Sequence, residues 1–127
     1  MAITLPENLV VLEIANNHMG DVSHGIELIN QYSKICKNYP QFNYAFKLQY
    51  RQLDKFIHKA YKDRFDLHYI KRFQETKLEA GDFDKFVDCI KSNGHYAMVT
   101  AFDNESYELI SRQPVDIVKV ASCSFND

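Results

Sequence analysis

Short apolar segments alternate along this chain with segments of helical periodicity, and this alternation constrains the fold more than any other feature. Residues 9–15, LVVLEIA, are nearly all apolar and β-prone, which predicts a strand covered on both faces. Gly20 and Asp21 then offer a turn and an N-cap, and apolar residues recur at helical spacing from Val22 to Lys37. The alternation continues with strands expected at residues 44–49, 96–102 and 115–122, and helices expected at residues 82–92 and 104–112.

The part between the second strand and the second helix is less regular. Residues 50–78 are charged and aromatic, contain no Gly or Pro and show no strict period, so we expect a loop with short helical pieces. The resulting order, β-α-β-(irregular, α)-β-α-β, predicts parallel strands in an α/β fold. The four strands could form a small open sheet. They could equally be the first half of a (β/α)8 barrel, which typically needs about 250 residues.

Length and composition exclude several classes of protein. The chain has 127 residues, which fits one domain, and its net charge of −2 shows no basic footprint for nucleic acid. It contains no run of 18 or more apolar residues that could span a membrane, and its start resembles no signal peptide. Three cysteines without metal-ligand spacing predict reduced thiols and a cytoplasmic location.

Each expected strand carries charged or hydrogen-bonding side chains close to its carboxyl end. In parallel α/β folds these ends lie on one side of the molecule, where binding sites are built. Lys47 and Gln49 are two apart on one strand and therefore share a face. The side chains in question are Glu13 on the first strand, Lys47 and Gln49 on the second, Thr100 and the nearby Asp103 on the third, and Lys119 and Ser122 on the fourth.

Two lysines in equivalent places point to an anionic ligand, carboxylate or phosphate, with Glu13 able to act as an acid or base or to orient a hydroxyl group. A structural alternative remains, because a lysine in a buried strand needs a partner and Glu13 could form an ion pair that serves only stability. Spacing alone therefore predicts an anion-binding α/β site and no particular reaction.

Four stretches of the chain together resemble the N-acetylneuraminate (sialic acid) synthase family. In that family one strand ends E-I-(G/A)-x-N-H-x-G, the next carries K-x-Q, the third ends near T-P-F-D and the fourth reads Y-K-I-(A/G)-S. This chain has EIANNHMG at residues 13–20, KLQ at 47–49, TAFD at 100–103 and VKVAS at 118–122. The resemblance covers nearly the whole chain and is weakest at residues 50–80.

The resemblance implies that residues 1–127 are the N-terminal part of a (β/α)8 barrel, with the remaining barrel and an antifreeze-like domain beyond Asp127. It also implies condensation of phosphoenolpyruvate with an N-acetylated hexose such as N-acetylmannosamine, with release of phosphate and a divalent metal, manganese or magnesium. The 127-residue chain by itself is then not expected to catalyse the reaction. By position, Glu13 is the catalytic carboxylate, Lys47 and Lys119 contact phosphoenolpyruvate, Gln49 and Ser122 lie beside them, and Asn17 and His18 line the mouth of the site.

No metal ligand is assigned within this chain. A lone histidine in a turn such as that of His18 is more often a hydrogen-bonding residue than a ligand, and the family's metal histidines lie on later strands. Two departures from the family pattern concern Ala101, where a proline is usual, and Ser124, where a glutamate is frequent. They leave the acceptor sugar open.

A function of another class also fits the sequence. The chain could be a truncated, non-catalytic domain that binds an anion or associates with itself through exposed strand edges, as a homo-oligomer. Anion binding that depends on Lys47 and Lys119 would favour the synthase interpretation. A defined dimer without such binding would favour the alternative. Another barrel enzyme that handles phosphoenolpyruvate or a phosphosugar is a third possibility.

Overall fold

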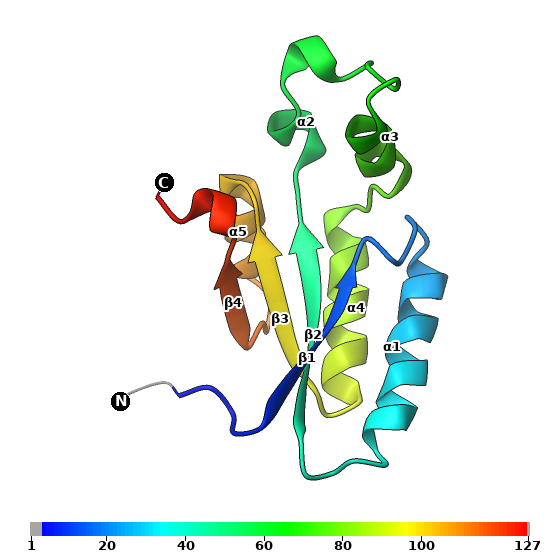
Figure 1. Ribbon diagram of the computed structural model, residues 1–127, viewed down its shortest axis with the longest axis vertical. Coiled ribbons are helices and arrows are strands. Elements are labelled where there is room, and N and C mark those ends of the chain that lie inside the picture. Colours follow the sequence, from blue (N-terminus) through cyan, green and yellow to red (C-terminus); the bar gives the residue numbers. More distant parts are fainter. Residues whose placement is uncertain (1–3, 127) are drawn as a thin grey trace.

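The computed structural model describes residues 4–126 and contains one sheet of four parallel strands in the order β1-β2-β3-β4. The strands are β1 (Leu9–Ala15), β2 (Asn43–Tyr50), β3 (Tyr96–Ala101) and β4 (Ile117–Val120). All four carboxyl ends point to the same end of the molecule (Figure 1). The predicted alternation and the parallel arrangement are confirmed. Strands in sequential order with helices between them are the arrangement of half a (β/α)8 barrel.

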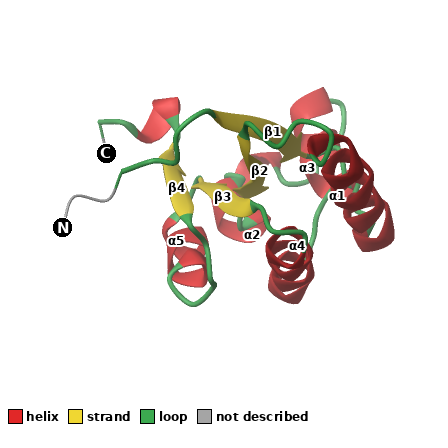
Figure 2. Ribbon diagram, turned by 90° about the horizontal axis from the view of Figure 1, so that it is seen from below, coloured by secondary structure: helices red, strands yellow, loops and turns green. Residues whose placement is uncertain are grey.

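Three helices lie against one face of the sheet (Figure 2): α1 (Val22–Cys36), α4 (Ala80–Ser92) and α5 (Asn104–Ile110). Alternate strand residues point to this covered face, among them Phe46, Leu48 and Val99, and these three are fully buried. They pack with apolar side chains of the helices in one core. The buried helix residues of that core are Ile29, Phe83, Phe86, Val87, Ile90 and Ile110.

The opposite face, which we call the open face, carries the alternate residues of the same strands. The prediction that the first strand is covered on both faces is wrong for the described chain, because Val11 is 37% exposed and Glu13 is also exposed. Right-handed crossovers between neighbouring strands in sequential order place every crossover helix on the same side of the sheet. Within the described chain, no crossover helix covers the open face, so its surface consists of strand side chains.

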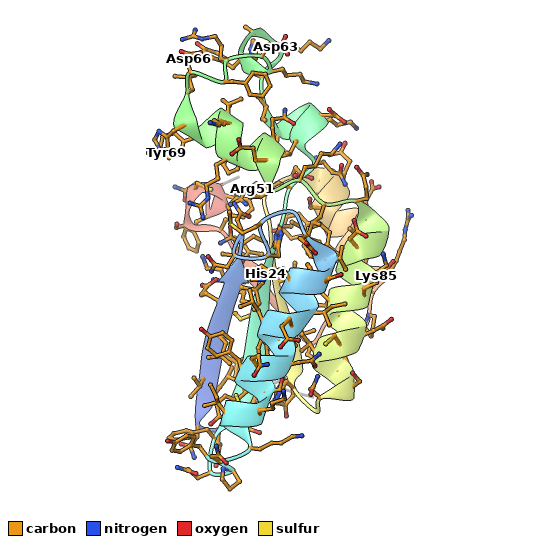
Figure 3. All side chains as sticks on the ribbon, turned by 90° about the vertical axis from the view of Figure 1, so that its right-hand side faces the viewer. His24, Arg51, Asp63, Asp66, Tyr69 and Lys85 are labelled. Atoms are coloured by element: carbon orange, nitrogen blue, oxygen red, sulfur yellow. The ribbon has the colours of Figure 1, made fainter. Side chains whose placement is uncertain are left out.

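The irregular stretch between β2 and α4 forms an excursion beyond the carboxyl ends of the strands (Figure 1). It contains the short helices α2 (Leu53–Phe56), η1 (Lys59–Tyr61) and α3 (His68–Glu75), as the lack of period predicted. Asp63, Asp66 and Tyr69 lie at its outer part, whereas Arg51 lies inward at its base (Figure 3).

Element boundaries differ from the predictions by a few residues, for identifiable reasons. Asp21 caps α1 as predicted, because its Oδ1 accepts a hydrogen bond from the His24 amide at 3.1 Å. Helix α4 begins two residues earlier than predicted, since Glu79 and Asp82 form a capping box. Strand β4 is shorter than predicted, and the chain enters the 3₁₀ turn η2 (Ser122–Ser124) soon after it.

The three cysteines, Cys36, Cys89 and Cys123, are free, as their spacing predicted. Within residues 4–126 no helix is long and apolar enough to cross a membrane.

Candidate functional site

Strand register brings most of the predicted site residues together in two rows on the open face. Parallel partners place Glu13 beside Lys47, with Met98 and Ile117 continuing that row across β3 and β4. Neighbouring strands lie about 4.8 Å apart, so partner side chains on one face are within contact range. The next row toward the carboxyl ends contains Gln49, Thr100 and Lys119.

Glu13 and Lys47 form an ion pair between Oε1 and Nζ. The Lys47 side chain is only 11% exposed, whereas that of Glu13 is 50% exposed. The pair predicted as a structural alternative is therefore formed. Because the carboxylate is half in solvent, it remains accessible to a ligand, while it compensates the more buried ammonium group.

Thr100 has an unusual position in the second row. Its side chain is buried, and its Oγ1 has no hydrogen-bond partner among the described residues. It lies between Gln49 on one neighbouring strand and Lys119 on the other. A buried hydroxyl group without a partner costs free energy unless water or a ligand satisfies it. This row therefore offers a cation, an amide and a free hydroxyl group side by side.

The carboxyl end of β1 is distorted where it enters the turn. The register shifts between Glu13 and Ala15, and Ala15 has a φ of 47°, which is uncommon for a residue with a Cβ. Met19 and Gly20 also have positive φ values, of 54° and 75°. A Cβ on Gly20 would lie 2.7 Å from the carbonyl oxygen of Glu75, so the turn fits closely under the end of α3. The bulge and the turn together set the directions of the Asn17 and His18 side chains.

His18 is buried in this turn and is held by it. Its Nδ1 accepts a hydrogen bond from the Gly20 amide at 3.1 Å, which leaves the proton of the neutral ring on Nε2. Burial is the main cause that lowers the pKa of His18 to about 4, with the nearby His24 adding to it. At neutral pH the ring is therefore uncharged. Its Nε2–H can donate a hydrogen bond into the pocket that it lines.

Asn17 and Ser122 lie apart from the two rows. Asn17 is exposed and lines a groove along β1 and α1 together with Glu13 and His24. Ser122 is exposed at the start of the turn that follows β4. The structure thus groups Glu13 with Lys47 and Gln49 with Lys119. It places His18 and Gln49 around one small pocket.

Arg51 is a site residue that the sequence analysis missed. Its guanidinium carbon lies 4.1 Å from the ring centroid of Phe102 and 4.9 Å from that of Phe73, and its Nη2 donates a hydrogen bond to Gln49 Oε1 at 2.7 Å. Arg51 follows Lys47 and Gln49 at the same two-residue spacing. The spacing could have indicated that Arg51 shares a face with Lys47 and Gln49. Arg51 was not selected because it lies in a stretch of the sequence that is rich in charged residues.

The part of the chain that the structure describes offers no cluster of three or more His, Cys, Asp or Glu side chains able to hold a metal ion. These residues do not supply a ligand set for manganese or magnesium.

Comparison with known proteins identifies the family. The NeuB family model matches residues 43–127, about two thirds of the chain. The chain belongs to the NeuB family. The matched region contains Lys47, Gln49, Lys119 and Ser122 but not Glu13, which lies before it. No curated protein matches the chain.

Two solved structures are similar to this NeuB-family chain. The first is a protein assigned as spore coat polysaccharide biosynthesis protein E from Chromobacterium violaceum, with 47% identity and a TM-score of 0.90 over 95% of this chain. The second is the N-acetylneuraminic acid (sialic acid) synthetase from Leptospira borgpetersenii in complex with citrate, with 18% identity and a TM-score of 0.70, also over 95% of this chain. The chain spans 36% of the first structure and 41% of the second.

Proposed function

We propose that the open face forms one side of a sialic acid synthase-type active site, which condenses phosphoenolpyruvate with an N-acetylated hexose such as N-acetylmannosamine. A carbon–carbon bond forms between phosphoenolpyruvate and the carbonyl carbon of the sugar, one water molecule is consumed, and phosphate is released. The observation that carries the proposal is the alignment of two lysines, an amide and an unpartnered hydroxyl group in adjacent rows on one face. Membership of the NeuB family supports it, and so does the fold shared with a sialic acid synthetase.

In this proposal the cationic and neutral side chains of the open face bind phosphoenolpyruvate. Phosphoenolpyruvate carries a carboxylate and a phosphate group, and Lys47 and Lys119 supply one cation in each row. Thr100 and Gln49 add neutral donors between them, and Ser122 adds a hydroxyl group from the turn beyond β4. Ammonium groups act as point charges that orient and hold such anions.

Glu13 is the one carboxylate in these two rows, and in our proposal it lies between the two substrates. Its ion pair with Lys47 fixes its position, while its exposed half can accept or donate a proton at the sugar. The proposal includes a divalent metal, manganese or magnesium, as the resemblance to the synthase family implies. The described residues do not supply its ligands.

The test is calorimetric titration of the chain with phosphoenolpyruvate. We expect Lys119→Ala to weaken binding by about tenfold or more, because one charge-assisted contact contributes roughly 1.5–3 kcal/mol. Lys34→Ala is the matched control, since Lys34 is exposed on α1 and lies on the opposite side of the sheet. Equal affinity in wild type and Lys119→Ala would contradict the proposal.

One observation favours the alternative function, self-association. Among the described residues, β1 and β4 each pair with a single strand, and Val118 and Val120 on β4 are 48% and 52% exposed. Unpaired edges with apolar side chains are templates for pairing between chains. Light scattering during size exclusion distinguishes the two functions. A defined dimer that binds no phosphoenolpyruvate would replace the enzyme proposal.

A further inference from the structure

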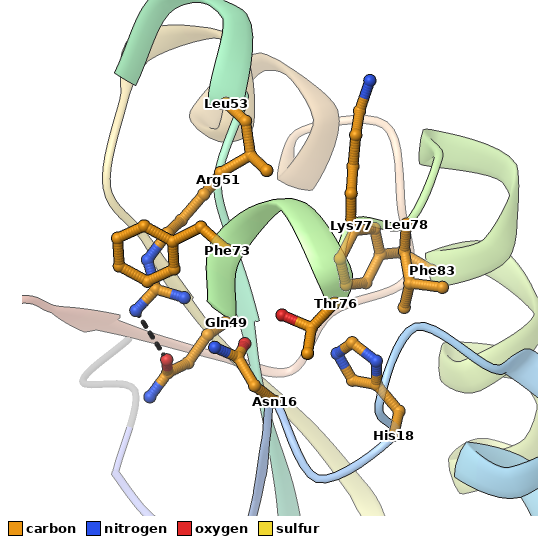
Figure 4. Close-up of a pocket in the computed structure, with 10 residues that line it drawn as sticks. All are labelled: Asn16, His18, Gln49, Arg51, Leu53, Phe73, Thr76, Lys77, Leu78 and Phe83. Carbon is orange, nitrogen blue, oxygen red and sulfur yellow. Dashed lines mark hydrogen bonds between the residues drawn. The ribbon is translucent and has the colours of Figure 1, made fainter. Parts of the chain in front are cut away.

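Gln49 and Arg51 form a hydrogen-bonded pair where β2 ends and the excursion begins (Figure 4). The Nη2 of Arg51 donates to Gln49 Oε1 at 2.7 Å. An arginine side chain carries donors only, whereas a glutamine amide carries an acceptor oxygen and a donor nitrogen. The amide oxygen of Gln49 must therefore face Arg51, and its nitrogen points away from Arg51 (Figure 4). The contact fixes the direction in which the amide is turned.

Arg51 is itself held in place by its surroundings. Its guanidinium carbon lies 4.1 Å from the ring centroid of Phe102 and 4.9 Å from that of Phe73, so two aromatic rings from distant parts of the chain restrain the flat group. The nearby Asp103 carboxylate accepts hydrogen bonds from two backbone amides. Among the described residues, Gln49 is the only side chain that accepts a hydrogen bond from Arg51.

The free space beside Arg51 is too small for part of a substrate. The cavity that Gln49 and Arg51 line together has a volume of about 20 Å³, which is room for about one water molecule. A carboxylate or phosphate group does not fit against Arg51 in this cavity. An influence of Arg51 on a bound substrate therefore passes through Gln49.

The Gln49 side chain lies on the open face, in the row that continues with Thr100 and Lys119. Its Nε2 donates no hydrogen bond within residues 4–126, so both of its N–H groups are available to a ligand. An anion held by Lys119 is stabilised by neighbouring donors and repelled by a neighbouring carbonyl oxygen. The direction of the Gln49 amide therefore decides whether this side chain favours or opposes such an anion.

We propose that Arg51 is a positioning residue, which holds the Gln49 amide with its nitrogen toward phosphoenolpyruvate bound on the open face. This rests on the proposed function, in which Lys47 and Lys119 bind the two anionic groups of that substrate. Without Arg51 the amide is free to turn over and to present its oxygen to the anion. Arg51 consequently contributes to affinity only when Gln49 is present.

A double-mutant cycle, measured by calorimetric titration of the chain with phosphoenolpyruvate, tests this dependence. Arg51→Met and Gln49→Ala should each weaken binding by about threefold to tenfold, the effect of one hydrogen bond. The double variant should bind within about 1.5-fold of Gln49→Ala alone, because Arg51 acts through Gln49. Losses that multiply in the double variant would show that Arg51 acts by itself, through its charge or through the fold, and would overturn the proposal. Unchanged affinity in Arg51→Met would do the same.

Arg64→Met is the matched control, because Arg64 is exposed on the same excursion and pairs with Asp66. It should bind phosphoenolpyruvate as tightly as the wild type. In Arg51→Met, methionine retains an apolar side chain between the two rings, and the thermal midpoint shows whether the fold is retained.

A second measurement, by nuclear magnetic resonance on the wild-type chain, needs no Arg51 variant. The side-chain amide signal of Gln49 is the one that is missing in Gln49→Ala. Phosphoenolpyruvate should shift this signal and leave that of Gln31 in place, because Gln31 is exposed on α1 and donates to Glu27. A Gln49 signal that phosphoenolpyruvate does not move would overturn the proposal. Failure of the proposed function would appear separately, as phosphoenolpyruvate binding that is absent or unaffected by Lys119→Ala, and the role of Arg51 would fall with it.

Discussion

The covered face and the open face of the sheet consist of alternate residues of the same strands, yet they are held by different interactions. On β2, Phe46, Leu48 and Tyr50 point to the covered face and are buried in the apolar core. Lys47 and Gln49 point to the open face, where an ion pair and hydrogen bonds replace apolar packing. The covered face therefore determines stability, and the open face is free to carry polar chemistry that would weaken a core.

The largest expected effect is a difference in the stability cost of truncating a side chain on each side of the sheet. Phe86→Ala, in the centre of the covered side, should lower the free energy of unfolding by about 3–5 kcal/mol, because it leaves a cavity in a close-packed core. Val11→Ala on the open face should cost less than about 1 kcal/mol, since Val11 is already partly in solvent. Urea unfolding of both variants measures the difference. Similar costs would mean that the open face is packed as tightly as the covered one.

A second pair of variants examines the contact between helices on the covered side. A Cβ on Gly25 of α1 would lie 2.5 Å from Phe86 Cζ and 3.0 Å from His18 Cβ. Gly25→Ala should therefore destabilise the fold by about 1–3 kcal/mol through overpacking. In Gly81→Ala the new Cβ meets nothing within 4 Å, so this helical position should gain about 0.5–1 kcal/mol. Thermal unfolding that shows the two variants shifted in the same direction would contradict the close contact.

The third prediction concerns His18, which lies where the two faces meet. Its folded pKa of about 4 is below the usual 6.5, so between these values the unfolded chain binds a proton that the folded chain does not. Stability should consequently fall as the pH is lowered from about 6.5 to 4, by no more than about 1.4 kcal/mol per pH unit from this group. Burial also lowers the pKa of His95, which adds in the same direction.

Urea titrations at several pH values between 7.5 and 4.5 measure that slope. The slope should decrease in His18→Gln and stay unchanged in His68→Gln, because His68 is exposed on α3 and does not contribute to the lowered pKa of His18. An unchanged slope in His18→Gln would show that His18 is not kept neutral by burial.

The smallest expected effect lies at the bulge that ends β1 beside the open face. Ala15→Gly should raise the free energy of unfolding by about 0.5 kcal/mol, because a positive φ strains alanine more than the added flexibility of glycine costs the fold. Ala97→Gly, in the regular and buried part of β3, should instead lower it by about 1 kcal/mol. Differential scanning calorimetry resolves the sign. Destabilisation of both variants to the same extent would argue against the strained bulge.

The sequence alone determined the order of the elements and the ends of the strands that carry polar groups. Periodicity is a local property, so β1 and α1 were predicted almost to the residue, and the capping role of Asp21 was evident from its position. The same logic identified Glu13, Lys47, Gln49 and Lys119 as a group, since parallel strands bring equivalent positions together. The role of each in binding or catalysis stays a prediction.

Which of these side chains are in contact follows from the fold and could not be predicted from the sequence. Register across the sheet made Glu13 the partner of Lys47, and the bulge at Ala15 directed Asn17 outward and His18 inward. Arg51 became a pocket residue because Phe73 and Phe102, distant in sequence, enclose it. Such contacts depend on how loops fold back over strand ends and join residues that are distant in sequence. Hydrophobic periodicity and turn-forming residues are local patterns and do not predict them. Burial and pairing therefore had to be read from the fold.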